Sequence, residues 1–183
     1  MVYILLGAGF ETAEALVAAN ILRRGGVAVK LAGIGGPTVA SSHNIVVTAD
    51  CPVESVTLSA GDMVVLPGGM GGVSSIAACP AAMALAEQAA KSDELWLAAI
   101  CAAPAMLAEA GVLPAGKKAV CYPGMEGALT AAGLVPCMGL HAVRDGKLIT
   151  GRAPGAACEF GFALLEALAG ADTARSVREQ MWV

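Results

Sequence analysis

The chain has 183 residues, of which 57% are hydrophobic and 14% are charged, with a formal net charge of −4 at neutral pH. This length predicts one domain. The composition excludes intrinsic disorder, because the chain has ample apolar surface to bury and little charge to resist burial. Eleven Lys and Arg against fifteen Asp and Glu leave no basic excess for phosphate contacts, so no nucleic-acid partner is expected.

The mean hydropathy of +0.71 raises the question of a membrane span. The longest apolar run, residues 95–108, is shorter than the roughly 20 residues that cross a bilayer, and Pro104 interrupts it. The first residues lack the basic stretch of a signal peptide. We therefore expect a soluble, cytoplasmic protein with no membrane partner.

In the first half of the chain, short apolar runs alternate with helix-favouring stretches. The pattern predicts a strand at 2–8, a helix at 11–24, a strand at 27–34, an irregular segment at 39–48 that can form a hairpin, and a strand at 63–66. The near-continuous apolar character of the first and last of these strands is typical of parallel strands buried on both faces.

The second half continues the alternation. It predicts a helix at 77–91 with Pro80 in its first turn, a strand at 95–100, a helix ending near residue 110, a short strand at 118–121, a helix at 124–132, a hairpin of 141–144 with 147–150, a long helix ending at 168, and a last helix at 172–180 capped by Asp172. The whole predicts one α/β domain over residues 1–183, with a mostly parallel sheet and helices on both faces. Functional sites in such sheets form at the carboxyl ends of the strands.

The loops after the first and third strands argue against two nucleotide-binding motifs. The first loop lacks the third glycine of G-x-G-x-x-G, where Thr12 stands instead. The glycine-rich segment at Gly68 and Gly69 allows close backbone approach to a ligand, but no Gly-Lys-Ser/Thr follows as in a P-loop. Glu14 lies one helical turn after Glu11, in a less exposed setting.

The sharpest signal is Cys101, which follows the strand at 95–100 directly and is flanked by small residues. This pattern is typical of a nucleophile elbow, in which a tight strand-to-helix turn projects a reactive side chain. The start of the next helix is expected to lower the pKa of the thiol. The alternative is that Cys101 is a buried packing thiol. We favour the nucleophile.

Four segments at these strand ends resemble the ThiJ/PfpI superfamily. They are Gly9-Phe10-Glu11-x-x-Glu14, Leu66-Pro67-Gly68-Gly69, Ala99-Ile100-Cys101-Ala102-Ala103-Pro104 and Arg152-Ala153-Pro154-Gly155. Within it they look most similar to the branch of the deglycase and redox-chaperone proteins. The resemblance implies a flavodoxin-like three-layer α/β sandwich, usually a homodimer, without metal or organic cofactor.

The resemblance also implies roles for individual residues. Cys101 corresponds to the reactive, oxidation-sensitive cysteine, and Glu14 to the carboxyl group that hydrogen-bonds its sulfur and stays protonated beside a thiolate. Backbone amides of Gly69 and Ala102 would form an oxyanion hole. Arg152 would border the pocket and help to hold an anion. Gly68 and Tyr122 complete the expected pocket.

Tyr122 marks a departure from the family pattern, since many members carry a histidine at that position. Neither His43 nor His141 replaces it. A Cys-His protease dyad or an amidotransferase triad is therefore poorly supported. Three functions stay open: a cofactor-free enzyme that acts on a small carbonyl substrate such as a 2-oxoaldehyde, a redox sensor or chaperone that works through oxidation of Cys101, and a hydrolase of a small metabolite.

The other five cysteines are expected to be bystanders. The six thiols include no C-x-x-C pair, and with two separated histidines they form neither a disulfide framework nor a zinc-type cluster. Cys121 borders the predicted pocket, so a disulfide with Cys101 under oxidation is conceivable. The five are Cys51, Cys79, Cys121, Cys137 and Cys158.

Overall fold

A computed structural model describes residues 1–183, and its centre is a seven-stranded sheet in the order β10-β11-β7-β6-β1-β2-β5. The strands are β1 (Val2–Leu6), β2 (Val29–Gly33), β5 (Cys51–Pro52), β6 (Met63–Leu66), β7 (Trp96–Ile100), β10 (Ala142–Asp145) and β11 (Leu148–Gly151). All neighbouring pairs are parallel except β10 with β11. Every residue of β6 and β7 is buried, as their apolar runs predict.

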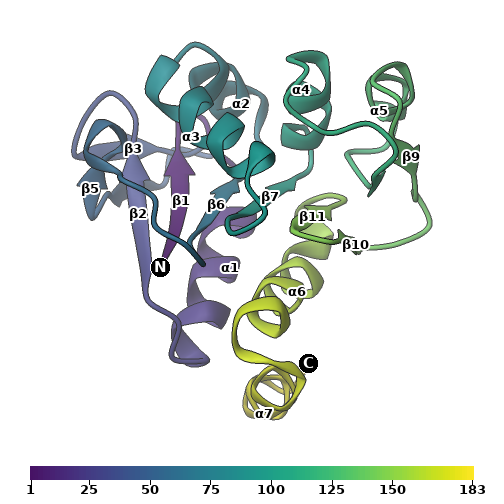
Figure 1. The fold of residues 1–183 in the computed structure, drawn as a ribbon. Coiled ribbons are helices and arrows are strands. Elements are labelled where there is room, and N and C mark those ends of the chain that lie inside the picture. Colours follow the sequence, from purple (N-terminus) through teal and green to yellow (C-terminus); the bar gives the residue numbers. More distant parts are fainter.

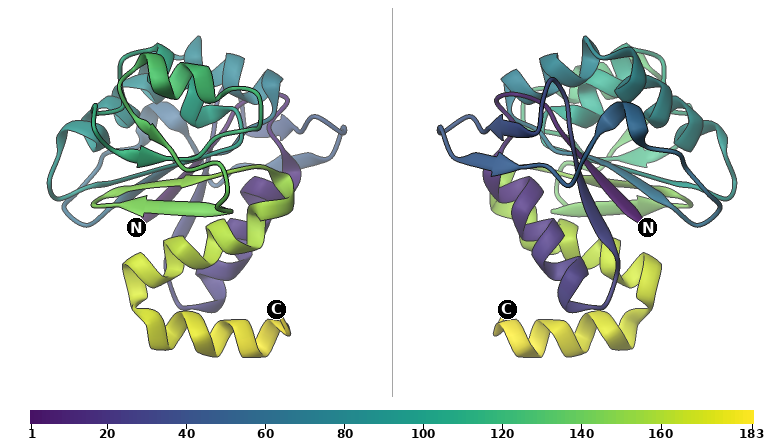
Figure 2. Two further views of the ribbon diagram at one scale, coloured as in Figure 1. Left: turned by 90° about the vertical axis from the view of Figure 1, so that its right-hand side faces the viewer. Right: turned by 90° about the vertical axis from the view of Figure 1, so that its left-hand side faces the viewer.

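Helices cover both faces of this sheet (Figures 1 and 2). One face carries α1 (Thr12–Arg24) and α6 (Ala157–Ala169), with α7 (Ala171–Met181) beyond them at the end of the chain. The other face carries α2 (Met70–Ala77), α3 (Pro80–Lys91), α4 (Ala103–Glu109) and α5 (Glu126–Ala131). The predicted three-layer sandwich of the flavodoxin-like class is confirmed.

Small residues allow α1 and α6 to pack closely on one another. A Cβ atom added at Gly161 of α6 would lie 2.8 Å from Ile21 Cδ1 and 3.3 Å from the backbone of Ala18, both in α1. Ala15, Ala18 and Ala19 of α1 are buried. The chain's richness in Ala and Gly therefore brings helix α1, and Glu14 with it, close to the sheet.

Two predicted hairpins are confirmed. β3 (Thr38–Ala40) and β4 (Val46–Thr48) pair antiparallel and project from one side of the molecule (Figure 2). β10 and β11 also pair antiparallel, and Gly146 in their turn has a φ of +65°, a conformation that glycine adopts without steric cost.

The helix predicted at 77–91 is α3, which begins later, at Pro80, and a separate helix, α2, that was not predicted ends at Ala77. The glycine-rich segment after β6 enters α2 directly after Gly69, which lies at the N-cap with a φ of +82°. Because glycine has a low helix propensity, the sequence pattern did not predict helix α2.

Three further details differ from the sequence prediction. The strand at 118–121 contracts to β8 (Lys118–Ala119), which pairs with β9 (Val135–Pro136) in a separate two-stranded sheet. The two-residue edge strand β5 was not predicted. Asp172 lies in the first turn of α7 and not at its N-cap, which is Gly170.

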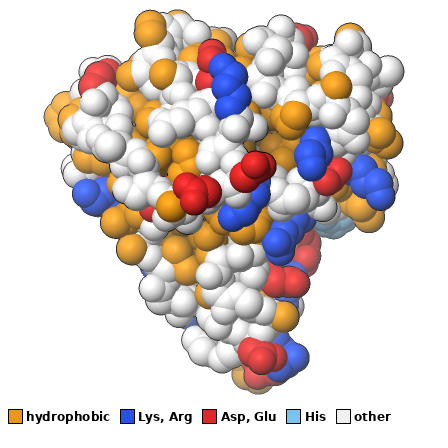
Figure 3. Space-filling view, in the orientation of Figure 1, with side chains coloured by type: hydrophobic (Ala, Val, Ile, Leu, Met, Phe, Trp, Pro, Cys, Tyr) orange, Lys and Arg blue, Asp and Glu red, His pale blue; other side chains and the backbone are white.

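Charged side chains of both signs are interspersed on the face drawn in Figure 3, and no extended basic area appears there. No single helix is long and apolar enough to cross a membrane. Helices α2 and α3 taken together have the length and composition of a span, but the chain bends sharply between them.

Candidate functional site

Cys101 lies in the tight turn between β7 and α4, at the carboxyl edge of the parallel strands. Its φ is +67°, a left-handed conformation that side chains other than glycine rarely adopt. The turn is held on both sides, because Cys101 N donates to Gly151 O at 3.0 Å and Cys101 O accepts from Tyr122 N at 2.7 Å. Such strain costs on the order of 1–3 kcal/mol and persists where surrounding structure enforces it. The backbone has the form expected of a nucleophile elbow.

Glu14 is fully buried in the first turn of α1, beneath this turn. Its Oε2 atom accepts a hydrogen bond of 2.6 Å from the Gly68 amide, which follows β6. Its other oxygen, Oε1, is buried without a hydrogen-bond partner. A buried carboxyl group with one free oxygen is costly as a purely structural element, and it is suited to exchange a proton with a neighbour.

Gly68 lies against both Glu14 and Cys101, and no larger residue fits there. A Cβ atom added at Gly68 would lie 2.5 Å from Cys101 Cβ, 2.9 Å from Cys101 Sγ and 2.7 Å from Glu14 Oε2. Contacts this short do not occur between real atoms of these kinds. The missing side chain is therefore what lets the carboxyl and the thiol approach each other.

The two groups are buried together, and burial dominates their electrostatics. Burial raises the pKa of Glu14 to about 7, in the direction expected for a carboxyl group that is protonated in the pocket. Burial, followed by the nearby Glu14 charge, raises the pKa of Cys101 to about 12. Hydrogen bonds from the amides of Gly69 and Ala102 act on the Cys101 thiol in the opposite sense and lower its pKa.

This raised thiol pKa corrects the sequence-based expectation of a lowered one. The helix that follows, α4, has only 7 residues, and none of the influences on the pKa of Cys101 comes from a cation. Two backbone amides do not outweigh burial beside a carboxyl group. The resting state of the pair is therefore a protonated thiol next to a carboxyl group whose pKa is raised toward neutral pH.

A cavity of about 240 Å³ opens onto the Cys101 turn. Cys101 is 7% exposed and lines this cavity, which gives reagents a route to its thiol. Met70, Met125 and Pro154 give the cavity an apolar wall, and Glu11 is the one charged residue that lines it. The full lining is Glu11, Gly69, Met70, Cys101, Ala102, Tyr122, Met125 and Pro154.

The structure brings most of the predicted site residues together. Cys101, Gly69, Ala102 and Tyr122 line the cavity, and the buried Glu14 lies next to Gly68, which is also in contact with Cys101. Sequence reasoning did not assign Met70, Met125 or Pro154, whose contribution depends on how α2, α5 and the loop before α6 pack around the turn.

Arg152 does not line this cavity. Its Nη1 atom donates to the Met138 carbonyl at 3.4 Å, and its backbone amide donates to the His141 carbonyl at 2.9 Å. Its guanidinium therefore braces the segment before β10. The predicted role in holding an anion has no support in the residues that line the cavity.

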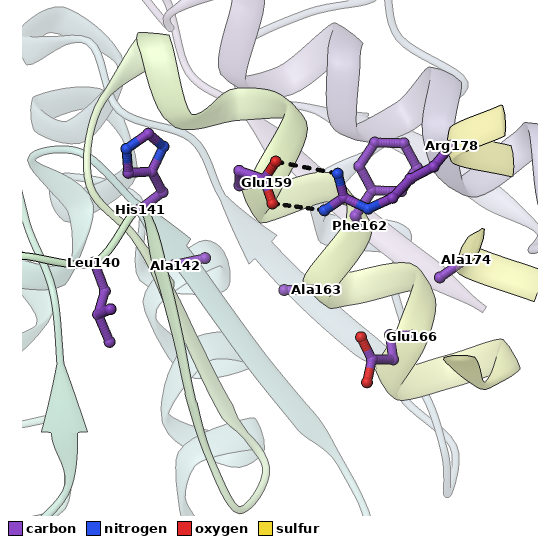
Figure 4. A pocket seen from close by; sticks show the side chains of 9 residues that line it. All are labelled: Leu140, His141, Ala142, Glu159, Phe162, Ala163, Glu166, Ala174 and Arg178. Carbon is purple, nitrogen blue, oxygen red and sulfur yellow. Dashed lines mark hydrogen bonds and ion pairs between the residues drawn. The ribbon is translucent and has the colours of Figure 1, made fainter. Parts of the chain in front are cut away.

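A larger cavity of about 450 Å³ lies between α6, α7 and the start of β10 (Figure 4). It contains no cysteine, and two of its charged residues, Arg178 of α7 and Glu159 of α6, pair with each other. Arg178 Nη1 donates to Glu159 Oε1 at 3.1 Å, and the guanidinium lies 4.0 Å from the centre of the Phe162 ring. We assign this region a structural role.

The remaining cysteines form no second reactive site. All six thiols are free. Cys121 is buried, and burial raises the pKa of its thiol to about 11. No group of three or more His, Cys, Asp and Glu side chains is arranged to hold a metal ion.

The fold and the site together define an α/β sandwich with a buried cysteine–carboxyl pair at a strand-to-helix turn. Residues 1–167 match the DJ-1/PfpI family. The chain belongs to this family.

Known proteins similar to this chain cover nearly its whole length. It is 36% identical over 181 residues to dj-1beta of Drosophila melanogaster, covering 98% of this chain and 95% of the relative. The crystal structure of that relative superposes with a TM-score of 0.90 at 33% identity, over 100% of this chain and 97% of the other. A Caenorhabditis elegans relative called glutathione-independent glyoxalase DJR-1.2 is 29% identical over 91% of this chain and 87% of its own. A structure of oxidized Toxoplasma gondii DJ-1 has a TM-score of 0.85 at 28% identity, over 99% and 97% of the two chains.

Proposed function

We propose that the chain is a cofactor-independent enzyme that converts 2-oxoaldehydes to 2-hydroxy acids, with Cys101 as nucleophile and Glu14 as proton shuttle. The observation that carries this proposal is the buried Glu14 carboxyl, whose pKa of about 7 suits a group that both accepts and donates protons at neutral pH. A relative described as a glutathione-independent glyoxalase supports the same reaction class.

In the first step, the sulfur of Cys101 attacks the aldehyde carbon of the substrate while the thiol proton passes to ionised Glu14. A carbon–sulfur bond forms, and the carbonyl oxygen becomes an alkoxide. The amides of Gly69 and Ala102, which already hydrogen-bond the sulfur, are available to stabilise this charge. Glu14 then returns its proton to the alkoxide, which leaves a neutral hemithioacetal.

In the second step, Glu14 removes the proton from the former aldehyde carbon and delivers it to the adjacent carbon, while the hydroxyl proton of the hemithioacetal passes to the oxygen of that adjacent carbon. The product is a thioester of the 2-hydroxy acid on Cys101. Water then cleaves the carbon–sulfur bond, releases the acid and restores the thiol. The sum is one 2-oxoaldehyde plus one water to one 2-hydroxy acid, with no external oxidant or reductant.

The test is turnover of methylglyoxal by the purified protein, with lactate as the measured product. We expect Cys101→Ser to abolish turnover. Cys79→Ser is the matched control, because Cys79 lies at the N-cap of α3, where serine is a favourable residue. A Cys101→Ser variant as active as the parent would refute the proposal.

A second candidate function is redox sensing through Cys101. A sulfinic acid at this position would meet the amides of Gly69 and Ala102, and oxidized DJ-1 of Toxoplasma gondii is a structural relative. The raised pKa of Cys101 disfavours this candidate, since thiolates are the species that peroxide oxidises. Limited peroxide followed by peptide mass spectrometry distinguishes the two: oxidation spread over all six cysteines counts against a sensor.

The homodimer implied by the family and the cytoplasmic location expected from the sequence stay predictions. Light scattering on the purified protein tests the first and fractionation of the source cells the second.

A further inference from the structure

Glu11 is held at the mouth of the Cys101 cavity by contacts from two segments. Its Oε1 atom accepts from Ala13 N at 3.4 Å, and its Oε2 atom accepts from Ser42 Oγ at 3.2 Å. Its side chain is 17% exposed. The carboxylate therefore occupies a defined place beside the cavity and does not extend freely into solvent.

The hairpin of β3 and β4, which carries Ser42, is itself fixed to the loop that carries Glu11. Ser42 N donates to Phe10 O at 2.9 Å, and Gly9 N donates to Ala40 O at 2.8 Å. Phe10 and Ser41 form an isolated parallel bridge. These backbone contacts keep Ser42 within reach of Glu11.

The charge that Glu11 brings to the cavity is not neutralised by a cation in the lining. No Lys, Arg or His is among the lining residues. The nearest basic group is the exposed His43, whose Nδ1 is 3.9 Å from Glu11 Oε2 and 3.0 Å from Ser42 Oγ. Glu14, behind Cys101, is a second acidic group on the same side.

We infer that Glu11 is a specificity-determining residue that excludes anionic compounds from the Cys101 cavity and leaves it to neutral carbonyl compounds. The inference rests on the proposed function only for the reaction that takes place after a substrate has entered the cavity. The charge selection is a property of the cavity alone and is testable without turnover. With Met70, Met125 and Pro154 as its apolar wall, the cavity suits a 2-oxoaldehyde with a short uncharged chain.

The primary test uses two alkylating reagents of nearly equal size and different charge, neutral iodoacetamide and anionic iodoacetate. In each case the sulfur of Cys101 forms a bond to the methylene carbon, iodide leaves, and the thiol proton passes to Glu14 or solvent. Peptide mass spectrometry gives the rate at Cys101 separately from the other cysteines. The rate ratio of the two reagents, divided by the same ratio for N-acetylcysteinamide in solution, measures the exclusion of anions.

We expect this normalised ratio to favour iodoacetamide by about fivefold or more, as for like charges a few ångströms apart in a partly exposed site. The variant Glu11→Gln keeps a side-chain oxygen that can accept a hydrogen bond from Ser42. In this variant the normalised ratio should fall by roughly threefold or more, because the charge of Glu11 is removed while the Glu14 carboxyl remains. Glu54→Gln, a matched charge change in the exposed segment after β5, should leave the ratio unchanged. Equal ratios in parent and Glu11→Gln would overturn the inference.

Salt provides a second measurement that needs no variant. Raising ionic strength from 0.05 to 1 M shortens the screening length to about 3 Å. The normalised ratio of the unaltered protein should then approach one. A ratio that does not respond to salt would also overturn the inference, whether or not Glu11→Gln folds.

A turnover comparison separates this inference from the proposed function. The neutral 2-oxopentanal and the anionic 4,5-dioxopentanoate share a five-carbon chain and give 2-hydroxypentanoate and 2-hydroxyglutarate. Turnover of neither, with the alkylation selectivity intact, would refute the proposed reaction and leave the charge selection standing. Equal kcat/KM for both would refute the charge selection and leave the reaction standing.

Discussion

The amide of Gly68 donates a 2.6 Å hydrogen bond to Oε2 of Glu14, and this contact joins two residues that are 54 positions apart in the chain. It holds the Glu14 carboxyl against Gly68, on the same side of that glycine as Cys101. One oxygen of Glu14 is thus engaged, and the other is left without a partner. Four predictions follow from this arrangement.

Burial of Glu14 should make stability fall as pH rises. Its pKa is raised to about 7 in the folded state from 4.5, so the folded protein holds a proton that the unfolded chain releases. The stability that the folded protein gains by holding this proton is fully present below about pH 4.5 and is lost as pH rises to about 7. The shift corresponds to about 3 kcal/mol. In urea unfolding at pH 5 and pH 8, Glu14→Gln should lose less stability over this interval than the parent; parallel losses would contradict the prediction.

The same group should govern the pH dependence of turnover. Ionised Glu14 is needed to accept the thiol proton, so kcat/KM for methylglyoxal should rise with pH and level off above about pH 7, the pKa of Glu14 in the free protein. Glu14→Gln should reduce kcat/KM by about 10²- to 10⁴-fold, with no inflection near pH 7. An unchanged inflection in this variant would assign it to another group.

Gly68→Ala should damage the site more than an ordinary Gly→Ala change. The added methyl group would lie 2.5 Å from Cys101 Cβ and 2.7 Å from Glu14 Oε2, so the pair must separate. We expect a loss of about 1–3 kcal/mol in unfolding free energy, as for overpacking, and at least a tenfold loss of turnover. Gly127→Ala is the control: nothing lies within 4 Å of its added Cβ, and in α5 alanine should be neutral or stabilising.

The left-handed backbone at Cys101 should reverse the usual order of stability of alanine and glycine variants. At most positions Ala is more stabilising than Gly, but a φ of +67° disfavours any side chain by about 1–2 kcal/mol. We therefore expect Cys101→Gly to be at least as stable as Cys101→Ala in urea unfolding. A Cys101→Ala variant that is clearly the more stable would show that the turn relaxes when the thiol is removed.

Local sequence signals predicted the elements that carry the site. The apolar strand before Cys101 and the small residues after it indicate the strand-to-helix turn, and the structure has that turn at the same residues. Prediction failed where local propensity conflicts with packing. The glycines of α2 and the two-residue strands β5 and β9 have weak signals of their own, and only neighbouring segments stabilise them.

The pKa of Cys101 is another property that local sequence signals predicted wrongly. A thiol before a helix predicts a lowered pKa, whereas burial together with Glu14 raises it. The charge lining of the cavity also differs from expectation, because Arg152 is directed to Met138 and Glu11 lines the mouth.

The sequence by itself determined the alternation of strands and helices, the apolar excess that buries them and the position of one cysteine at a strand end, because these depend on residue order and short-range sterics. How strongly that cysteine and Glu14 are desolvated, and which charge faces the cavity, became known from the tertiary structure alone. Those properties depend on distance and burial between segments far apart in the chain, and no local pattern contains them.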